Sequence, residues 1–339
     1  MKAIVCERPG LLQTIDVELP SPREGEAVVR IRRIGICGTD LHAYQGNQPF
    51  FSYPRILGHE LAGVVEAVGE HTEGVRPGDQ VSIIPYLHCG RCVACRAGKT
   101  NCCTRMRVLG VHEDGGMREQ IAVPVSHLIP AKGLTLDQTA LLEPLSIGMH
   151  AIRRSELQAG ETALVIGAGP IGLGVMAFAK QAGARVIALD VNDKRLAFCR
   201  AWAGADAAVN GADSPEAKIA ELTGGDYPTA VFDATGSKRS MESAYRYVAH
   251  GGRLVYVGLV REHIQFDDPE FHKREMAVMG SRNATREDFG RVADLLQAGK
   301  LDTGAYITHR MPFAELADRF TELQRPESGV IKAVAELEE

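Results

Sequence analysis

The sequence predicts an α/β protein that combines a strand-rich part with a doubly wound parallel sheet. In the first third, short β-branched runs such as 27–32 and 63–69 are bounded by glycine, proline and charged residues, with no helix between them. Further on, a buried-strand run at 162–166 leads directly into a glycine-rich turn and an apolar helix, and strands and helices then alternate. These two patterns indicate two different architectures in one chain.

Length and composition are those of an ordinary globular protein. The 339 residues, 45% of them hydrophobic and 24% charged, suffice for two domains with a core each. The net charge of −5 argues against a nucleic-acid or anionic-membrane surface, and no apolar run approaches the ~18 residues of a membrane span. The chain starts without the pattern of a secretory signal. We therefore expect a cytoplasmic protein whose eight cysteines serve as metal ligands rather than in disulfides.

Three donor types that Zn²⁺ accepts stand close together near the N-terminus. Cys37 offers a thiolate, His59 an imidazole and Glu60 a carboxylate. A catalytic zinc takes three protein ligands and keeps one position for water or substrate. Between them, Thr39 and His42 offer a hydroxyl and an imidazole that can carry a proton from a zinc-bound alcohol to solvent. This stretch predicts a catalytic metal site.

A second group of cysteines follows in a segment that has little apolar material. The tight spacing of Cys89, Cys92 and Cys95 predicts a tetrahedral site of four thiolates, with Cys102 or Cys103 as the fourth. Such a site has no open position, so we expect a structural metal that replaces a missing core. Reduced free cysteines and an iron–sulfur cluster are the alternatives.

The glycine-rich turn after the strand at 162–166 has the sequence of a dinucleotide-binding loop. Its glycines permit a tight turn and a close approach of the backbone to a pyrophosphate, which the N-terminus of the following helix attracts. The next strand ends in Asp190, whose carboxylate suits the ribose hydroxyls and repels a 2′-phosphate, so the pattern predicts NAD rather than NADP. Arg195 complicates this prediction, since an arginine can meet a phosphate. The residues of the loop are Gly167, Gly169, Pro170, Ile171 and Gly172.

Two further strands, at 229–236 and 252–259, end in glycine-bearing loops, which in a parallel sheet lie at the ligand-binding carboxyl edge. A last strand is expected within 276–285, where Arg282 is a candidate for binding a cofactor phosphate or a substrate carboxylate. Apolar spacing predicts a helix at 287–299, and the tail reads as helix and then strand. The cofactor-binding residues expected from these loops are Val257, Gly258, Leu259, Ser281, Arg282 and Asn283.

The motifs at 36–42 and 58–60, followed in order by the cysteine segment and the glycine-rich loop, resemble those of the medium-chain dehydrogenase/reductase family. The resemblance implies a GroES-like zinc catalytic domain at 1–152 and 286–339 and a Rossmann NAD-binding domain at 153–285. It also implies one catalytic and one structural zinc per subunit, and a homodimer or homotetramer. The apolar runs at 254–257 and 277–279 are expected toward the edge of the open sheet, where a second subunit can pair.

The same resemblance makes Cys103, rather than Cys102, the fourth ligand of the structural zinc. Glu143, at the start of a helix, stands where zinc alcohol dehydrogenases have a second cysteine. The catalytic zinc would therefore be held by Cys37 and His59 together with either Glu60 or Glu143. Asp40 is expected to orient His59 through its second ring nitrogen.

The segments 46–55, 268–273 and 280–285 resemble those of sugar-acid dehydrogenases, which oxidise the C5 hydroxyl of a hexonate such as L-galactonate or L-gulonate. A polyol or L-threonine is the alternative substrate, and a non-catalytic zinc-containing binding protein is the alternative of a different class. A hexonate needs several hydrogen-bonding partners and one cation. The candidates for these roles are Gln48, Tyr53 and Asn283, with Arg282 or Lys273 as the cation.

Overall fold

The computed structural model describes residues 1–47 and 51–338, and by its internal contacts the chain divides into two compact units. Unit 1 comprises Met1–Pro144 and Thr285–Glu339, and unit 2 comprises Leu145–Ala284. The division falls inside helix α4 (Leu142–Ser155), which also contains the boundary at 152/153 given above. No helix of the described residues is long and apolar enough to cross a membrane.

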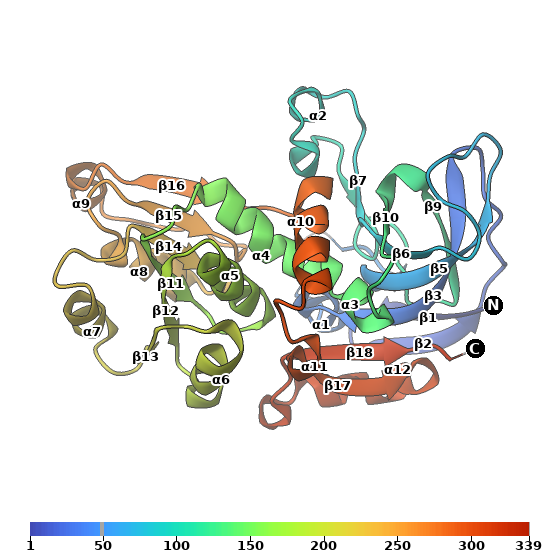
Figure 1. The fold of residues 1–339 in the computed structure, drawn as a ribbon. Helices are drawn as coiled ribbons and strands as arrows, with labels where there is room; N and C mark the ends of the chain where they lie inside the picture. The colour runs from blue at the N-terminus through green and yellow to red at the C-terminus, as the bar shows by residue number, and fades with distance from the viewer. Residues whose placement is uncertain (48–50, 339) are drawn as a thin grey trace. The chain divides into compact units, whose positions relative to one another are not determined.

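Unit 1 is built from β-sheets (Figure 1). The larger sheet has the order β10-β6-β5-β3-β18-β17, with β9 also paired to β3, and a smaller sheet has the order β2-β1-β4. The chain's tail contributes β18, which pairs antiparallel with β3 and brings Ala333 opposite Ile36. The strands of unit 1 are β1 (Lys2–Arg8), β2 (Leu11–Asp16), β3 (Glu26–Ile36), β4 (Arg55–Ile56), β5 (Glu60–Val68), β6 (Gln80–Ile83), β7 (Tyr86–Leu87), β8 (Arg107–Val108), β9 (Gln120–Pro124), β10 (Leu128–Pro130), β17 (Ile307–Pro312) and β18 (Lys332–Glu336).

The central strands β1, β3, β5 and β18 of unit 1 contain runs of consecutive buried residues, whereas β9 alternates between buried and half-buried ones, and the buried side chains join in a shared apolar core. That core includes Ile34 of β3, Leu61 of β5 and Ile83 of β6, together with Phe320 from the tail. The metal-ligand candidates therefore stand at the ends of strands that are held by a continuous core. The helices of unit 1 are α1 (Gly38–Tyr44), α2 (Val93–Arg96), α3 (Leu136–Ala140), α10 (Arg286–Gln297), α11 (Thr303–Tyr306) and α12 (Leu316–Arg319).

Unit 2 is a six-stranded parallel sheet of order β13-β12-β11-β14-β15-β16 with helices packed on it (Figure 1). This is the strand order of the Rossmann fold, so the α/β prediction is confirmed. The sheet's carboxyl edge carries the loops that follow β11, β12, β14, β15 and β16. The strands are β11 (Thr162–Ile166), β12 (Arg185–Asp190), β13 (Ala207–Asn210), β14 (Ala230–Asp233), β15 (Arg253–Tyr256) and β16 (Ala277–Gly280), and the helices are α5 (Pro170–Gln181), α6 (Asp193–Ala203), α7 (Pro215–Leu222), α8 (Lys238–Ala244) and α9 (Asp268–Lys273).

The two apolar runs expected toward the open edge lie in β15 and β16, the last two strands on that side of the sheet. The run at 254–257 belongs to β15, which lies between β14 and β16 and is an interior strand. Strand β16 is the edge strand, as expected for 277–279, and within the described residues it pairs with β15 alone. Its Val278 is 43% exposed. The strand is also shorter than the segment 276–285, since it ends at Gly280.

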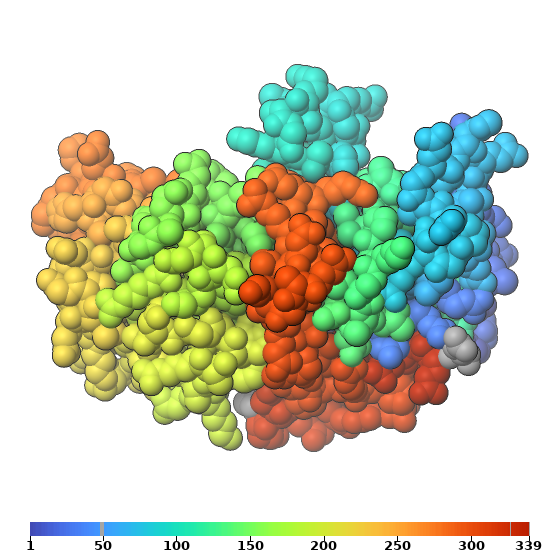
Figure 2. Space-filling view, viewed as in Figure 1, coloured from blue at the N-terminus to red at the C-terminus, as the bar shows by residue number. Residues whose placement is uncertain are grey.

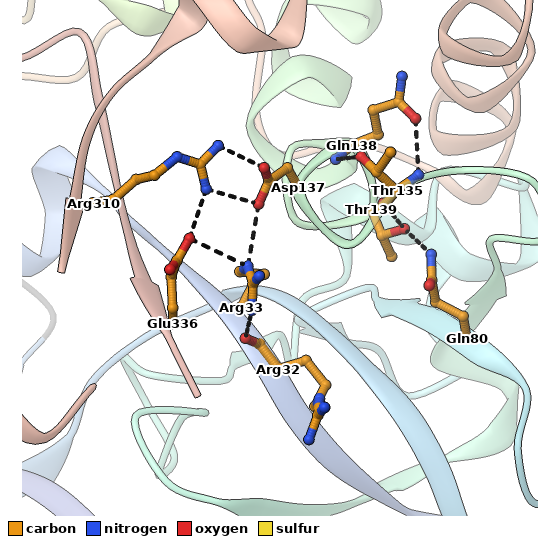
Figure 3. A network of polar contacts seen from close by, with 9 residues as sticks. All are labelled: Arg32, Arg33, Gln80, Thr135, Asp137, Gln138, Thr139, Arg310 and Glu336. Atoms are coloured by element: carbon orange, nitrogen blue, oxygen red, sulfur yellow. Dashed lines mark hydrogen bonds and ion pairs between the residues drawn. The ribbon is translucent and has the colours of Figure 1, made fainter. Parts of the chain in front are cut away.

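A polar network fixes helix α3 on the sheet of unit 1 (Figure 3). The Asp137 carboxylate accepts hydrogen bonds from Arg33 Nε at 3.2 Å and from Arg310 Nη2 at 2.5 Å, and Glu336 accepts one from Arg310 Nη1 at 2.7 Å. On the other side of the helix, Gln80 Nε2 donates to the Thr139 hydroxyl at 2.7 Å. Because α3 leads directly into α4, this network also fixes the start of α4.

Candidate active site and metal centres

The structure brings three of the predicted zinc ligands together in unit 1. Donor atoms of Cys37, His59 and Glu60 all lie within 4.8 Å of one another. Cys37 is half-buried and stands at the end of β3, where it caps helix α1, whereas His59 and Glu60 stand at the start of the antiparallel strand β5. The pairing of β3 with β5 therefore joins ligands that are more than twenty residues apart in sequence.

Asp40 organises the backbone around this group. Its carboxylate is fully buried and accepts the N–H of Cys37 at 2.9 Å and the N–H of Gly58 at 3.1 Å. Its Oδ1 lies 3.9 Å from Nδ1 of His59, which is too long for a hydrogen bond. The Nδ1 atom is buried and has no hydrogen-bond partner among the residues that the structure describes. Asp40 thus positions both ligand segments and lies at ion-pair distance from the second ring nitrogen of His59, without a direct hydrogen bond to it.

Glu60 is engaged by a lysine from the tail of the chain. Lys332 Nζ lies 2.6 Å from Oε1 and 2.7 Å from Oε2 of Glu60, and it also donates to the Ile36 carbonyl at 3.3 Å. Both side chains are almost completely buried. The Glu60 carboxylate therefore already has a full positive charge beside it.

Glu143, the second residue of α4, is also buried but is held differently. Its Oε1 accepts a hydrogen bond from the hydroxyl of Tyr86 in β7. Glu143 does not belong to the set of donor atoms that lie within 4.8 Å of one another among the described residues. The structure thus places Glu60 nearer to Cys37 and His59, and gives each carboxylate a different partner.

The charges in this region favour a bound cation. Asp40, Glu60 and Glu143 are buried, and among the described residues Lys332 is the one buried lysine or arginine. Burial raises the pKa of Glu143 to about 7 and also raises the pKa of Asp40. Although burial opposes protonation of His59, the nearby Cys37 and Asp40 raise its pKa well above the usual value. A divalent cation would supply the missing positive charge, so these residues fit a zinc ion.

Thr39 and His42 lie on helix α1, three residues apart and thus on one face of the helix. Thr39 is half-buried and His42 is exposed. The expected proton relay needs such a pair, with the hydroxyl on the more buried side and the imidazole exposed to solvent.

The four-cysteine group is also assembled within unit 1. Ligand atoms of Cys89, Cys92, Cys95 and Cys103 lie within 4.8 Å of one another, whereas Cys102 is exposed and lies outside the group. Backbone N–H groups point at the sulfur atoms. Cys103 Sγ accepts from the N–H of Cys89 at 3.3 Å, and the N–H of Cys95 helps to lower the pKa of Cys92 to about 5.

N–H donors stabilise thiolates, so the donor set fits a tetrahedral metal ion. The segment that carries it contains α2 and stands out from the surface (Figure 2). We refer to residues 89–103, which carry the four cysteines, as the projecting segment.

The glycine-rich loop of unit 2 has the shape of a cradle. Gly167 has φ +95°, and a Cβ at Gly172 would meet the Gly167 carbonyl oxygen at 1.8 Å, so both positions require glycine. At Gly169, in contrast, a Cβ would meet no atom within 4 Å, so packing does not explain this glycine. Pro170 is the first residue of α5, whose N-terminus has no side-chain cap. The loop therefore fits a pyrophosphate. Ile171 follows in the first turn of α5.

Asp190, the last residue of β12, stabilises this loop by hydrogen bonds. Its Oδ2 accepts the N–H of Ala168 at 2.6 Å, and its Oδ1 accepts the N–H of Asn192 at 2.9 Å. Each carboxylate oxygen has two lone pairs, so both can still accept a hydroxyl. Arg195 is exposed in the first turn of α6.

The loops after β14, β15 and β16 meet at the same edge of the sheet. The Asp233 carbonyl accepts the N–H groups of Val257 at 2.8 Å and Gly258 at 2.9 Å, and a Cβ at Gly258 would meet the backbone N of Gly236 at 2.5 Å. Leu259 is 67% exposed. After β16, the hydroxyl of Ser281 is buried and finds no hydrogen-bond partner within residues 1–47 and 51–338, so a ligand could satisfy it. Arg282 and Asn283 follow, and Asn283 has φ +53°.

The candidate substrate residues are spread over both units. The Tyr53 hydroxyl donates to the carbonyl of Ala43 in α1, so it has a structural partner in unit 1. Lys273 is in unit 2 at the end of α9, and its Nζ lies 3.2 Å from Oε1 of Glu270. Gln48 lies outside the described residues.

The residues that sequence reasoning missed are Lys332, Tyr86 and Tyr306. Tyr306 is fully buried, and the charges of Lys332 and Glu60 act on it. A signal was available for Lys332, since it is a charged residue inside the apolar run 330–335. Tyr86 has no such signal, because its partner Glu143 is 57 residues away.

Comparison with known proteins identifies the family. Residues 23–133 match the alcohol dehydrogenase GroES-like domain, and residues 170–298 match the zinc-binding dehydrogenase family. The chain is 44% identical to L-galactonate-5-dehydrogenase of Escherichia coli (strain K12) over 320 residues, which are 94% of either chain. It is 32% identical to L-threonine 3-dehydrogenase of Bacillus velezensis over 98% of both chains. It is also 32% identical to L-idonate 5-dehydrogenase of Vitis vinifera, over 88% of this chain and 84% of that protein.

Solved structures agree with this result. An alcohol dehydrogenase from E. coli CFT073, complexed with NADH, superposes with a TM-score of 0.93 at 32% identity over 99% of both chains. A zinc-binding dehydrogenase from Sinorhizobium meliloti 1021, bound to NADP, gives 0.91 at 29% identity over 99% of both chains. The zinc-ligand types, the dinucleotide cradle and these similarities together establish that the chain belongs to the zinc-type medium-chain dehydrogenase family and is an oxidoreductase that acts on a CH–OH group with a nicotinamide cofactor.

Proposed function

We propose that this enzyme oxidises a secondary hydroxyl of a sugar acid, at C5 of a hexonate such as L-galactonate or L-gulonate, with NAD⁺ as the hydride acceptor. The observation that carries the catalytic part is the buried group of Cys37, His59 and Glu60, which lies among more acidic than basic side chains. The substrate class is supported by the 44% identity to L-galactonate-5-dehydrogenase.

We assign the catalytic zinc to Cys37 and His59, with Glu60 or Glu143 as the carboxylate, and the structural zinc to the four cysteines of the projecting segment. A bound zinc acts as a Lewis acid that lowers the pKa of the substrate hydroxyl. Cys37 and His59 would hold the zinc ion from the core side of unit 1. The paired strands β3 and β5 keep the two ligands in fixed register.

Thr39 and His42 carry the released proton in this proposal. The Thr39 hydroxyl accepts it near the substrate, and the exposed imidazole of His42 on the same helix face passes it to solvent. Replacing His42 by Gln should therefore lower kcat and change its pH profile, while zinc content stays unchanged. An unaltered pH profile of His42→Gln would contradict the relay.

We assign NAD because Asp190 stands where the ribose hydroxyls of the adenosine half bind. Its negative charge would oppose a 2′-phosphate. The Asp190→Asn variant keeps one oxygen acceptor and the side chain's size but removes the charge. We expect the ratio of kcat/KM for NAD⁺ over NADP⁺ to fall at least about tenfold in this variant, which corresponds to about 1.4 kcal/mol. An unchanged ratio would contradict the role of Asp190.

Two other substrates have support among the relatives. L-threonine 3-dehydrogenases match at 32% identity, and a galactitol-1-phosphate dehydrogenase superposes with a TM-score of 0.92 at 26% identity. A panel of hexonates, hexitols and L-threonine, assayed with NAD⁺ before and after treatment with a chelator, separates these possibilities by kcat/KM. A hexitol or threonine that is used better than every hexonate would overturn the proposed substrate. Activity that survives complete removal of zinc would overturn the proposed metal.

We also propose a homo-oligomer, as a dimer or tetramer. The edge strand β16 exposes the apolar Val278 together with unpaired backbone groups, and such an edge favours pairing with a second copy. The Val278→Lys variant should lower the molar mass measured by light scattering, with no change in secondary structure. The molar mass of Val278→Lys is compared with that of the wild-type protein, which is also measured at high dilution.

A further inference from the structure

Tyr86 is a buried tyrosine whose hydroxyl contacts Glu143, one of the candidate zinc ligands. Its side chain is 4% exposed, and its hydroxyl donates a hydrogen bond to Oε1 of Glu143, which is also 4% exposed. No motif of the sequence assigns it a role. Electrostatic interactions connect Glu143 with His59 and Tyr86 with Cys37, so the pair belongs to the same network of charged groups.

The backbone of Glu143 is fixed independently of Tyr86. Glu143 is the second residue of α4, which follows α3 directly, and α3 is tied down by the Asp137 and Gln80 contacts (Figure 3). These contacts leave the glutamate's own torsions undetermined. The hydroxyl of Tyr86 is the group that fixes the direction of its carboxylate.

Tyr86 in turn is placed by the base of the four-cysteine segment. Strands β7 and β8 form a two-stranded ribbon in which Tyr86 lies opposite Val108, and the four cysteines stand between these two strands in sequence. The Pro85 carbonyl accepts the N–H of Leu109 at 3.0 Å, which continues the ribbon. A metal bound to the cysteines would close this ribbon at its far end, because Cys89 follows β7 and Cys103 precedes β8.

The two carboxylates near Cys37 therefore differ in charge balance. Glu60 is neutralised by the ammonium group of Lys332, which contacts both of its oxygens. Glu143 is bonded to a neutral hydroxyl, which orients the carboxylate without placing an ammonium group in contact with it. A carboxylate oriented by a neutral group is a better partner for a metal ion than one whose two oxygens are already held by an ammonium group.

We propose that Tyr86 is a positioning residue: its hydroxyl directs the Glu143 carboxylate toward the metal position at Cys37 and His59, and the β7–β8 ribbon makes the four-cysteine segment a support of that position. This inference rests on the proposed function, because it requires zinc at Cys37 and His59. It predicts that the two metal centres are coupled through one side chain.

The Tyr86→Phe variant of the full-length enzyme tests the first part, with Tyr247→Phe as a matched control. Tyr247 is buried in unit 2 and has no part in either metal centre. We measure zinc release to a chelating dye and the absorption spectrum of the cobalt-substituted protein, and Cys37→Ser identifies the release phase of the first site. For Tyr86→Phe we expect release from that site at a ten- to hundredfold lower chelator concentration. We also expect an altered cobalt spectrum and a lower kcat at unchanged KM for NAD⁺.

A Tyr86→Phe protein whose release profile and cobalt spectrum match those of wild type and Tyr247→Phe would overturn the inference. A wild-type enzyme that binds no zinc at the Cys37 site would overturn the proposed function itself, and this inference with it. Circular dichroism of Tyr86→Phe at the assay temperature shows whether the fold is retained.

The Cys103→Ser variant tests the contribution of the ribbon. It should weaken zinc retention at the first site as Tyr86→Phe does, and the double variant should lose little more than either single variant, since both changes act through the same hydroxyl. Fully additive losses in zinc retention would overturn the coupling. A Cys103→Ser protein with an unchanged cobalt spectrum at the first site would overturn it as well.

Discussion

The buried ion pair of Lys332 and Glu60 gives the sharpest prediction for stability. Both side chains are almost completely buried, and the ammonium contacts both carboxylate oxygens, at 2.6 and 2.7 Å. The Lys332→Met variant keeps the length of the side chain but removes its charge, so that Glu60 is left buried and unpaired beside Cys37. Removing one partner of a buried pair costs about 3–5 kcal/mol in the free energy of unfolding.

The expected effect on thermal unfolding follows from the size of unit 1. For 150–250 residues, about 1 kcal/mol shifts Tm by about 2–4 °C, so the metal-free Lys332→Met variant should melt roughly 6–20 °C below wild type. The assay is differential scanning calorimetry of chelator-treated protein, which resolves the two units if they unfold separately. The double variant Lys332→Met with Glu60→Gln should recover most of the loss, because it removes both charges.

Zinc provides a second measurement on the same variants. Because Glu60 lies within 4.8 Å of the donor atoms of Cys37 and His59, a bound zinc can compensate the carboxylate that Lys332→Met leaves unpaired. Zinc should therefore raise Tm more in Lys332→Met than in wild type. A metal-free Lys332→Met protein that melts at the wild-type temperature, or a double variant that is no more stable than the single one, would refute this reasoning.

Three further predictions concern unit 2. Hydrogen bonds from Arg253, at 2.6 and 2.9 Å, lower the pKa of Glu161 to about 2, so the pair contributes stability above about pH 4.5 and loses it as the pH falls toward 2. Glu161→Gln should thus lower Tm at pH 7 by an amount equivalent to about 1.5–3 kcal/mol. The difference in Tm from wild type should shrink in a pH series below about 4.5, and a difference that stays constant would contradict the role of this ion pair. Gly172→Ala should destabilise the fold of unit 2 in calorimetry, because its Cβ would meet the Gly167 carbonyl oxygen at 1.8 Å. Gly169→Ala should leave Tm of the cofactor-free protein unchanged yet weaken NADH binding in a fluorescence titration, since its Cβ enters open space in the free protein; unweakened binding would contradict the cradle.

Much of the fold was predictable because its signals are local. The run 162–172 contains a strand, a turn that needs glycine and the start of a helix, and each of these is decided by neighbouring residues. Local signals did not decide which of the apolar runs 254–257 and 277–279 forms the edge strand itself. An apolar strand shows that it is buried, but not whether another strand covers its edge, and β16 covers that of β15.

The candidate site shows the same division between local and distant information. The spacing of Cys89, Cys92 and Cys95 predicted a cluster that the structure forms, because its geometry depends on a short loop. A hydrogen bond between Asp40 and His59 was predicted from a general pattern of metal sites. The two side chains approach to 3.9 Å, but the hydrogen bonds of the carboxylate come from two backbone N–H groups. The sequence could not show this, since one of those groups comes from the loop before β5.

The choice between Glu60 and Glu143 depends on residues that no motif contains. The partner of Glu60 is 272 residues away and the partner of Glu143 is 57 residues away, and the two partners differ in charge. An ammonium group competes with a metal ion for the carboxylate it holds, whereas a hydroxyl orients its carboxylate without competing. The motif at 58–60 supplies a carboxylate close to the proposed metal position, while Lys332 and Tyr86 give the two carboxylates partners of different charge. If zinc binds as we propose, the choice of ligand would therefore depend on the tail strand β18 and the ribbon strand β7 as well as on the motif itself.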